Sequence, residues 1–455
     1  MTITTVNPTT GQTLADYPEM SNSQVEDILN KADSAFQIWR RTNLKDRVEH
    51  LIILASLLDA NKAEYAELMS KEMGKPFSDG LSEIEKCRWV CDYYADSATE
   101  LLADQMIKSD ASRSFVTYQP LGAILGIMPW NFPFWQVIRF AVPTLTAGNT
   151  SILKHSPNVT GCAMALEELF LAAGYPDNVF RIVVVDVPTV ASIIRDDRIK
   201  GVTLTGSTRA GKAVALEAGS SIKKTVLELG GNDPSVILAD ADVAHAATEC
   251  ITSRLTNSGQ SCIAAKRLIV VDEVRNQFEE LVVKGMSQAI MGDPMEPATS
   301  LGPIARSDLR ENLHRQVSES VSMGAQKLLG GKLLDPPGFF YPPTVLTNVG
   351  PGMPAYEEEL FGPVASIINV PNETEALRVA NDTAYGLGAS VYTANVEKGE
   401  RIAAEWLDAG ICFVNAFPRS DPRLPFGGIK QSGYGRELSP LGIREFVNVK
   451  TVWVS

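Results

Sequence analysis

The fold is decided by a short stretch that passes from a strand straight into a helix, and it reads Gly201-Val202-Thr203-Leu204-Thr205-Gly206-Ser207-Thr208-Arg209-Ala210-Gly211. Its first residues are mostly apolar or β-branched, which predicts a buried strand. Ser207 then stands at the N-cap of the helix that follows. The same alternation precedes it, with strands predicted over 150–154 and 179–185 and helices over 161–173 and 190–195. Such alternation predicts a parallel, doubly wound α/β sheet, which binds ligands at the carboxyl ends of its strands.

The chain on either side of this stretch has patterns of its own. Residues 1–20 predict an edge hairpin, and from Ser23 onward apolar residues recur every three or four positions, which predicts helices stacked before the first strand. After Gly231 a second series of helices and strands begins, including a strand over 367–370 and a helix over 373–381. The sequence therefore predicts two α/β domains.

Composition and charge exclude several classes of function. A chain of 455 residues is long enough for two or three cores. Its net charge of −13 argues against non-specific nucleic-acid binding, because a phosphate backbone demands a basic face. No apolar run reaches the roughly 18 residues needed to cross a bilayer, and the N-terminus has no signal-like core, so we expect no membrane association.

The numbers of cysteines and histidines indicate the cellular compartment and whether a metal site is expected. Six cysteines are too few for a disulfide framework in so long a chain, and they fit a reducing compartment, so we expect a cytoplasmic protein. The four histidines are scattered, and no metal site is expected. The charged segment 71–76, where a helix ends at Gly and Pro, is interpreted as solvated surface.

Cys262 lies in a setting typical of a nucleophile. Small residues flank it, among them Gly259, Ser261 and Ala264, and they leave open space beside the sulfur. A loop glycine also lets backbone N–H groups turn toward a reacting oxygen. The local pattern alone leaves a second interpretation open, in which Cys262 is a buried and unreactive thiol.

Two other positions favour the nucleophile. Glu228 lies inside the apolar run 226–229 and is followed by two glycines, and burial there would raise its pKa toward neutrality, which suits a general base. Asn131 lies in a turn that Pro129 and Pro133 fix, and so rigid an amide can donate to an oxyanion. A nucleophilic thiol, a buried carboxylate and a fixed amide donor together predict an acyl-transfer or aldehyde-oxidising site.

Six segments in this order resemble those of the NAD(P)-dependent aldehyde dehydrogenases, and the resemblance covers the whole chain. Within that family the chain is most similar to the bacterial succinate-semialdehyde dehydrogenases of about this length. The resemblance implies two doubly wound α/β domains plus a small β oligomerisation arm. The segments are Pro129-Trp130-Asn131-Phe132-Pro133, Thr205-Gly206-Ser207-Thr208, Leu227-Glu228-Leu229-Gly230-Gly231, Gly259-Gln260-Ser261-Cys262, Glu359-Leu360-Phe361-Gly362-Pro363 and Pro425-Phe426-Gly427-Gly428.

The resemblance also divides the chain into three parts. They are a dinucleotide-binding domain over 1–114 and 126–230, a catalytic domain with the nucleophilic cysteine over 231–420, and an oligomerisation arm over 115–125 and 435–455. The last stretch, 443–454, alternates apolar and polar residues and predicts a strand that completes the sheet of a neighbouring subunit. We therefore expect a homodimer or a dimer of dimers.

The cofactor implied by the resemblance is NAD or NADP. Gly206 and Ser207 are assigned to its pyrophosphate, because a helix N-terminus favours a phosphate; an ordinary capped helix is the alternative. Lys154 is assigned to the adenosine ribose. A glutamate that repels a 2′-phosphate often follows three residues later in the family, but here that position is Pro157, so NADP is not excluded and Lys154 and Ser156 remain as donors. The other contacts implied are Met128, Pro129, Trp130 and Leu229, with Glu359 and Phe361 at the nicotinamide ribose and ring.

Arg139 indicates the substrate. It lies eight residues beyond Asn131 on a helix predicted to run through Phe140, about two turns away on nearly the same face. Many members of the family have an aromatic residue there, whereas a guanidinium can bind the terminal carboxylate of a short aldehyde in bidentate fashion. A structural ion pair is the alternative. Four more residues are expected to complete the pocket, two by hydrogen bonds and two as walls: Ser261, Ser420, Trp135 and Phe417.

The predicted reaction is the oxidation of succinate semialdehyde, or a similar ω-carboxy aldehyde, through a thiohemiacetal and a thioester on Cys262. Asn131 and the Cys262 backbone N–H would hold the oxyanion, and Glu228 would activate the hydrolytic water. Glu437 resembles a family carboxylate that relays the proton, with a salt bridge as the alternative. Three other functions stay open: a general aliphatic aldehyde dehydrogenase, a coenzyme A-acylating semialdehyde dehydrogenase, and a non-catalytic binding protein of the same fold.

Overall fold

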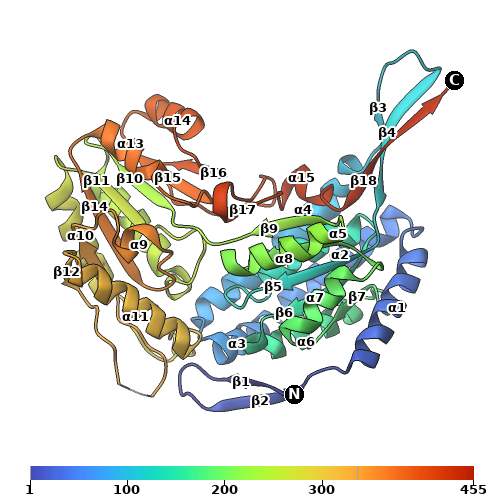
Figure 1. Cartoon of the computed structure of the whole chain (residues 1–455), viewed down its shortest axis with the longest axis horizontal. Coiled ribbons are helices and arrows are strands. Elements are labelled where there is room, and N and C mark those ends of the chain that lie inside the picture. Colours follow the sequence, from blue (N-terminus) through green and yellow to red (C-terminus); the bar gives the residue numbers. More distant parts are fainter. Residues whose placement is uncertain (1, 336) are drawn as a thin grey trace.

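The computed structural model describes residues 2–335 and 337–455, and these form two α/β units side by side with a β arm that projects from one of them (Figure 1). The predicted fold class is confirmed. We call the six-stranded sheet and its helices the first unit, the seven-stranded sheet and its helices the second unit, and the three-stranded sheet the arm. In the described part of the chain, no helix is both long and apolar enough to span a lipid bilayer.

The chain begins with a hairpin and four helices, as predicted; Met1 lies outside the described residues. The first helix starts where Ser21 and Gln24 form a reciprocal capping box, and it buries one side, including Val25, Ile28 and Trp39, against the first unit. The elements are β1 (Thr2–Val6), β2 (Thr13–Pro18), α1 (Asn22–Trp39), α2 (Leu44–Ala60), α3 (Lys62–Met73) and α4 (Phe77–Leu101).

The first unit has the strand order β17-β9-β8-β5-β6-β7, in which all neighbours are parallel except the edge strand β17. Helices α1, α7 and α8 share one apolar core with the sheet, and α2 to α6 share another, so both faces are covered. The elements are β5 (Ala123–Met128), α5 (Trp135–Thr146), β6 (Thr150–His155), α6 (Thr160–Ala172), β7 (Phe180–Ile182), α7 (Val187–Arg195), β8 (Ile199–Thr205), α8 (Thr208–Ser220), β9 (Lys224–Glu228) and β17 (Gly433–Tyr434).

The second unit repeats this arrangement, with strand order β12-β13-β14-β11-β10-β15-β16 and only β12 antiparallel. Helices α9 and α10 pack on one face, and α11 to α14 pack on the other. The elements are β10 (Pro234–Ile237), α9 (Val243–Leu255), β11 (Arg267–Val271), α10 (Arg275–Ser287), α11 (Ser307–Ser322), β12 (Gln326–Leu329), β13 (Thr344–Thr347), α12 (Pro354–Glu357), β14 (Val364–Val370), α13 (Glu373–Asn381), β15 (Gly388–Tyr392), α14 (Val396–Glu405) and β16 (Ile411–Val414).

The arm joins two segments that are far apart in the sequence. Strand β18 (Val447–Val454) runs antiparallel to β4 (Arg113–Pro120) over its whole length, and β3 (Gln105–Met106) pairs with the other edge of β4. Strand β3 lies outside the range 115–125 expected for the arm, so the division into domains stays a prediction. Figure 1 shows the arm pointing away from both units, with the C-terminus at its end.

Several predicted boundaries were wrong; the strand β14 and the helix α7, for example, each begin three residues before the predicted start. Helix α5 continues past Phe140 to Thr146 although Pro143 lies within it, because every residue of this helix is buried and packing offsets the lost hydrogen bond. Strand β7 spans only 180–182 instead of 179–185. The final strand starts at Val447 rather than at residue 443, since residues 439–443 form the short helix α15 (Ser439–Ile443) with proline in its first turn.

Gly433 is required where the edge strand β17 meets β9. Its φ is 113°, and a Cβ there would overlap the carbonyl oxygen of Leu227. We expect Gly433→Ala to lower the free energy of unfolding by about 1–3 kcal/mol, through backbone strain and the clash. Gly219 in α8 is the matched control, because a Cβ there meets nothing within 4 Å and its φ is ordinary. Gly219→Ala should raise the stability by about 0.4–1 kcal/mol in the same urea titration; equal effects of the two substitutions would contradict this account.

Candidate active site

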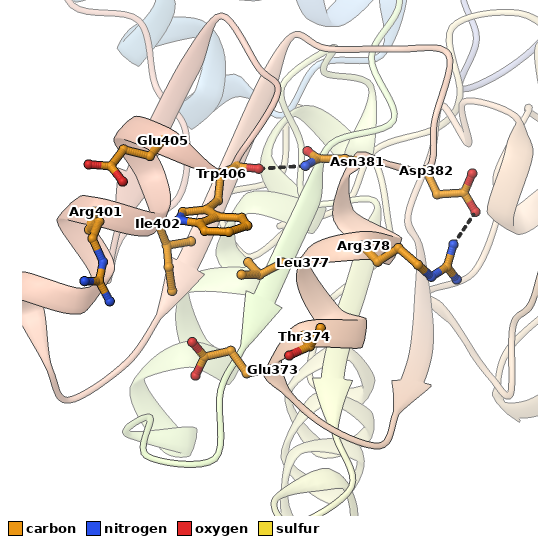
Figure 2. A pocket seen from close by; sticks show the side chains of 10 residues that line it. All are labelled: Glu373, Thr374, Leu377, Arg378, Asn381, Asp382, Arg401, Ile402, Glu405 and Trp406. Atoms are coloured by element: carbon orange, nitrogen blue, oxygen red, sulfur yellow. Dashed lines mark hydrogen bonds and ion pairs between the residues drawn. The ribbon is translucent and has the colours of Figure 1, made fainter.

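Two cavities differ in what lines them. The larger one, about 950 Å³, is a cleft between α13 and α14 on the second unit, where Leu377, Ile402 and Trp406 supply the apolar surface (Figure 2). Trp406 is 57% exposed there, and its carbonyl oxygen accepts a hydrogen bond from Asn381. Among the described residues that line this cleft, none is a predicted catalytic, cofactor or substrate residue.

The smaller cavity, of about 340 Å³, contains Cys262. Helices α4 and α5 of the first unit, the loop that carries Cys262 and the loop after β16 surround it, so both units contribute. All five residues that the sequence assigned to substrate binding line it together with the cysteine: Trp135, Arg139, Ser261, Phe417 and Ser420. Segments up to 285 residues apart in the sequence thus meet in one pocket.

The loop before Cys262 has a strained backbone. After α9 ends at Leu255, a short 3₁₀ turn (Thr256–Gly259) follows, in which Asn257, Ser258 and Gly259 have φ of 55°, 56° and 75°. The left-handed conformation costs about 1–2 kcal/mol for each residue that carries a Cβ. A Cβ at Gly259 would also overlap the backbone of Gly362. Such a loop persists only where the surrounding contacts determine it.

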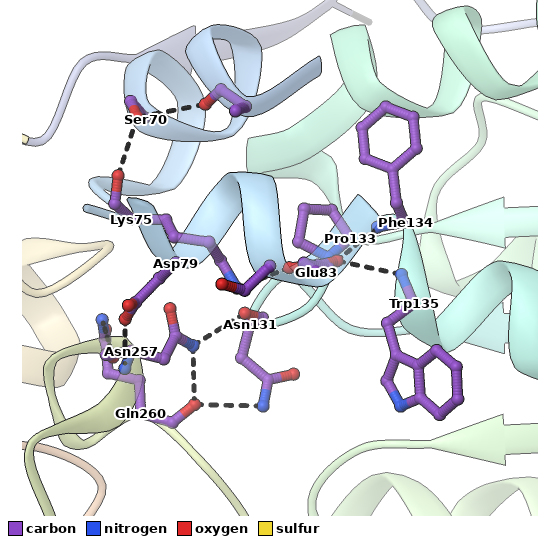
Figure 3. A network of polar contacts seen from close by, with 12 residues as sticks. Ser70, Lys75, Asp79, Glu83, Asn131, Pro133, Phe134, Trp135, Asn257 and Gln260 are labelled. Carbon is purple, nitrogen blue, oxygen red and sulfur yellow. Dashed lines mark hydrogen bonds and ion pairs between the residues drawn. The ribbon is translucent and has the colours of Figure 1, made fainter. Parts of the chain in front are cut away.

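A buried hydrogen-bond network supplies those contacts and ties the loop to Asn131 (Figure 3). The Asn257 side-chain amide donates to the carbonyl oxygens of Asn131, at 2.8 Å, and Gln260, at 3.1 Å. The Asn131 amide nitrogen donates to the same Gln260 oxygen, at 3.1 Å. An amide nitrogen carries two hydrogens, so one N–H of Asn131 is left for a ligand beside Cys262. The predicted oxyanion donor and the predicted nucleophile are therefore fixed relative to each other.

Helix α4 holds this network in place through residues that the sequence analysis missed. Buried Glu83 accepts hydrogen bonds from the backbone N–H groups of Phe134 and Trp135, both at 2.9 Å, and so caps helix α5. The same carboxylate forms a buried ion pair with Lys75, at 2.5 Å. Asp79 accepts from the backbone N–H of Asn257, at 2.8 Å. In the sequence these residues form a series of charges at helical spacing. Solvent-exposed helices have the same pattern, so it did not indicate that these charges are buried.

The interpretation of segment 71–76 as solvated surface was wrong. Lys75 is fully buried, and Glu72 is nearly so. The Glu72 carboxylate accepts from the backbone N–H groups of Gly161 and Cys162, at 2.8 and 2.9 Å, at the start of α6. The two charges sit at buried helix ends, where each finds hydrogen-bond partners from another part of the chain.

Cys262 is half-buried at the wall of the pocket. Burial raises the pKa of its thiol to about 12, and the positive charges of Lys266 and Arg139 oppose this shift. Lys266 donates to the Cys262 carbonyl oxygen at 2.5 Å and lies 3.4 Å from the Glu359 carboxylate. A thiol with so high a pKa needs a base, or a change in its surroundings, to become a nucleophile.

Glu228 and Arg139 lie at the end of β9 and on α5. Burial, and then the charge of Glu437, raises the pKa of Glu228 well above its usual value. Among the described residues, neither carboxylate oxygen of Glu228 has a hydrogen-bond partner. Arg139 pairs with Glu437, the Nε and Oε2 atoms lying 2.5 Å apart, and its guanidinium lies over the ring of Phe426. The ion pair that the sequence left open as an alternative for both residues is thus present, although Arg139 also faces the pocket.

The predicted cofactor residues follow one edge of the first sheet. Strands β6, β5, β8 and β9 are neighbours, and their carboxyl ends carry the positions assigned to the cofactor. Ser207 caps α8 by accepting from Ala210 N–H, at 3.3 Å. These positions are Met128 at the end of β5, with Pro129 and Trp130 behind it, Lys154 and Ser156 at the end of β6, Gly206 and Ser207 after β8, and Leu229 after β9.

The turn from β8 into α8 is the predicted pyrophosphate site. A Cβ at Gly206 would meet only Leu204 of its own strand, so this turn is open, and a capped helix N-terminus favours a phosphate. Phe361 packs edge-on against Trp130, with ring centroids 5.7 Å apart, and Glu359 accepts from Gly231 N–H at 3.1 Å. In the described residues, no group of three His, Cys, Asp or Glu side chains could hold a metal ion.

The sequence profile described as "Aldehyde dehydrogenase family" matches residues 1–452. The chain belongs to the aldehyde dehydrogenase family. The six segments that resembled this family surround the pocket and the sheet edge just described. Asn131 is tied to the Cys262 loop through Gln260, at the boundary of the two units. Glu228 lies at the end of β9 and is not among the described residues that line the Cys262 pocket.

Individual aldehyde dehydrogenases are similar over the whole chain. A probable succinate-semialdehyde dehydrogenase [NADP(+)] of Synechocystis sp. is 46% identical, with 100% of each chain covered. A succinate semialdehyde dehydrogenase [NAD(P)+] of Escherichia coli is 43% identical over 98% of this chain and 97% of its own. The crystal structure of a succinic semialdehyde dehydrogenase from Streptococcus pyogenes in complex with NADP+ superposes with a TM-score of 0.97, at 38% identity and 99% coverage of both chains.

The buried carboxyl of Glu228 should impose a pH dependence on stability. Because its folded pKa is raised, the unfolded chain ionises first, and wild-type stability falls as pH rises from about 4.5 toward the raised value. We expect the Glu228→Gln variant to gain stability relative to wild type by up to about 1.4 kcal/mol per pH unit over this range, measured by urea unfolding between pH 5 and 8. Exposed Glu280 on α10 is the control, and Glu280→Gln should show no such slope. A pH-independent difference for Glu228→Gln would contradict the assignment.

Proposed function

We propose that this protein oxidises succinate semialdehyde, or a similar short ω-carboxy aldehyde, to the acid with NAD or NADP. The observation that carries the proposal is the pocket itself, in which Cys262 faces Arg139 and the hydroxyls of Ser261 and Ser420. A pocket that holds a thiol together with cationic and hydroxyl donors suits an aldehyde with a terminal carboxylate. The names of the relatives from Synechocystis sp. and Escherichia coli support this choice.

In the proposed mechanism, the Cys262 thiol gives its proton to water in the pocket, and the thiolate adds to the aldehyde carbon to form a thiohemiacetal. The free N–H of Asn131 and the Cys262 backbone N–H stabilise the oxyanion, which the network through Asn257 keeps in position. NAD or NADP, when bound, supplies the hydride acceptor. The protein's part at that stage is to hold the thiohemiacetal beside the cofactor edge of the first unit and to keep water away from it.

Glu228 then acts as the general base for hydrolysis. It takes a proton from a water molecule, which attacks the Cys262 thioester, releases the acid and restores the thiol. A carboxyl whose pKa burial has raised accepts a proton near neutral pH more readily than an ordinary glutamate does. The charge of Glu437 raises the pKa of Glu228 further, which supports the proton-relay role proposed for Glu437. Arg139 forms an ion pair with Glu437.

We propose the same cofactor contacts that the family resemblance implied. Gly206 and Ser207 would hold the pyrophosphate, Lys154 and Ser156 the adenosine ribose, and Glu359 and Phe361 the nicotinamide half. Burial lowers the pKa of Lys154, as expected for an amine at the end of a buried strand. Either NAD or NADP fits, because no carboxylate stands at position 157 to repel a 2′-phosphate.

We also propose a cytoplasmic homodimer or dimer of dimers. Strand β18 has β4 on one side and, among the described residues, no strand on the other, where Val449 and Trp453 are 61% and 55% exposed. Strand β16 is likewise an edge of the second sheet, and all four of its residues are half-buried. Unpaired edges with apolar side chains favour pairing between copies. All six cysteines are free, which fits a reducing compartment.

A substrate panel tests the activity. We expect wild-type protein to reduce NAD or NADP with succinate semialdehyde at a higher kcat/KM than with hexanal, because only the semialdehyde has a carboxylate for the cationic and hydroxyl donors of the pocket. Cys262→Ala should lower turnover by about 10³-fold or more, whereas Cys250→Ala, at a buried position on α9, should retain it. The measurement is cofactor absorbance, with product analysis in the presence of coenzyme A.

Each alternative function has its own outcome in this panel. A preference for hexanal would favour a general aliphatic aldehyde dehydrogenase, and an acyl-coenzyme A product would favour the acylating class. No cofactor reduction with any aldehyde would favour a binding protein. Full turnover by the Cys262→Ala variant would overturn the assignment of the nucleophile.

The exposed edge of β18 can be tested separately. We expect the double substitution Val449→Asp and Trp453→Asp to shift the mass in sedimentation equilibrium toward the 49.3 kDa monomer, because charges on the strand oppose pairing with another copy. Leu216→Asp on α8 is the control, since Leu216 is 73% exposed but lies away from any sheet edge. An unchanged mass in the double variant would refute the proposed role of the arm.

A further inference from the structure

Lys86 lies in the substrate pocket and is absent from the set of residues that the sequence indicated. It comes from helix α4 and lines the cavity together with Cys262. Its ammonium donates a hydrogen bond to the Ser420 hydroxyl, at 2.6 Å, and lies 4.6 Å from the centre of the Trp135 ring. Two of the residues assigned to the substrate therefore hold Lys86 in place.

Lys86 is the part-buried cation of this pocket that has no ion-pair partner among the described residues. Arg139 is paired with Glu437 at 2.5 Å, whereas no carboxylate of the described residues lies within ion-pair distance of Lys86. The nearby carboxylate of Glu83 is occupied by Lys75 and by two backbone N–H groups. A third cation, Arg419, lines the cavity but is exposed to solvent. A partly buried ammonium without a counter-ion is stabilised when an anion binds beside it.

We infer that Lys86, together with Ser420, binds the terminal carboxylate of the aldehyde substrate. This inference rests on the proposed function and names the residue that determines its specificity. An ammonium has three donors, and only one is used by Ser420. Because Ser420 accepts that hydrogen bond, its own proton is free to donate to the same carboxylate. An uncharged aldehyde would leave both donors unpaired, so the pocket would bind it more weakly.

The protonation state of Lys86 supplies a second readout. Burial, reinforced by the charge of Arg139, lowers the pKa of Lys86 to about 8. The charge is therefore present below pH 8 and is lost above it, so the KM for a carboxylate substrate should rise as pH passes 8. The titratable and charged groups that face Lys86 come from α4, α5, the Cys262 loop and the loop after β16: Asp79, Glu83, Cys87, Arg139, Cys262, Arg419 and Asp421.

Substitution of Lys86 with and without loss of charge tests the inference. We expect Lys86→Met to raise the KM for succinate semialdehyde by about 10- to 100-fold, the loss expected for a hydrogen-bonded charge, and to leave the KM for butanal within about twofold. Lys86→Arg should keep the preference for the semialdehyde and should remove the rise in KM above pH 8, because a guanidinium stays charged. Lys71→Gln, an exposed lysine on α3, is the control for the loss of a positive charge.

The outcomes separate this inference from the proposed function. If wild-type protein shows no preference for succinate semialdehyde over butanal, the proposed function fails and the role of Lys86 fails with it. If wild-type protein has the preference and Lys86→Met keeps it, only the role of Lys86 is overturned. Equal increases in KM for both aldehydes in Lys86→Met would also overturn it, because a purely structural role would affect both substrates alike.

Discussion

The active-site region depends on a set of buried hydrogen bonds that join helix α4 to both units. Glu83, paired with Lys75, caps the N-terminus of α5, and Asp79 holds the backbone of Asn257. Without these partners, a buried carboxylate and a buried ammonium would each cost several kcal/mol. The ion pair and hydrogen bonds of these buried groups fix the turn at Asn131 against the strained loop before Cys262. Helix α4 thus positions the nucleophile and the oxyanion donor without reaching the reacting atoms itself.

The two part-buried or buried cations that line the pocket, Arg139 and Lys86, differ in their charge balance. Arg139 and Glu437 neutralise each other, and their pairing leaves Glu228 beside a carboxylate whose charge is already balanced. The raised pKa of Glu228 therefore comes mainly from its burial. A raised pKa suits the proposed general base, which must both accept and release a proton. The ammonium of Lys86 has the Ser420 hydroxyl and the Trp135 ring as neighbours, which orient it and leave its charge available.

The two sites meet because of the sheet topology. In an open, doubly wound sheet the ligand lies at the carboxyl ends of the strands, and the first unit places the ends of β5, β6, β8 and β9 side by side. The turn that carries Asn131 follows β5, and Glu228 ends β9, so two residues proposed for catalysis extend from the edge proposed for the cofactor. The second unit supplies Cys262 from the loop between α9 and β11. One sheet edge would therefore serve both the cofactor and the chemistry in the proposed mechanism.

The sequence by itself determined the two α/β units, because strand and helix periodicities alternate clearly from 150 to 205 and local patterns depend only on neighbours along the chain. It also indicated Cys262, Glu228 and Asn131, since small residues, glycines and prolines leave a local signal. Only the tertiary structure decided that Lys75, Glu83 and Lys86 are buried and that Arg139 is paired with Glu437. A charged residue on a helix has the same local sequence whether it faces water or a pocket, and its partners lie on segments that folding alone brings together.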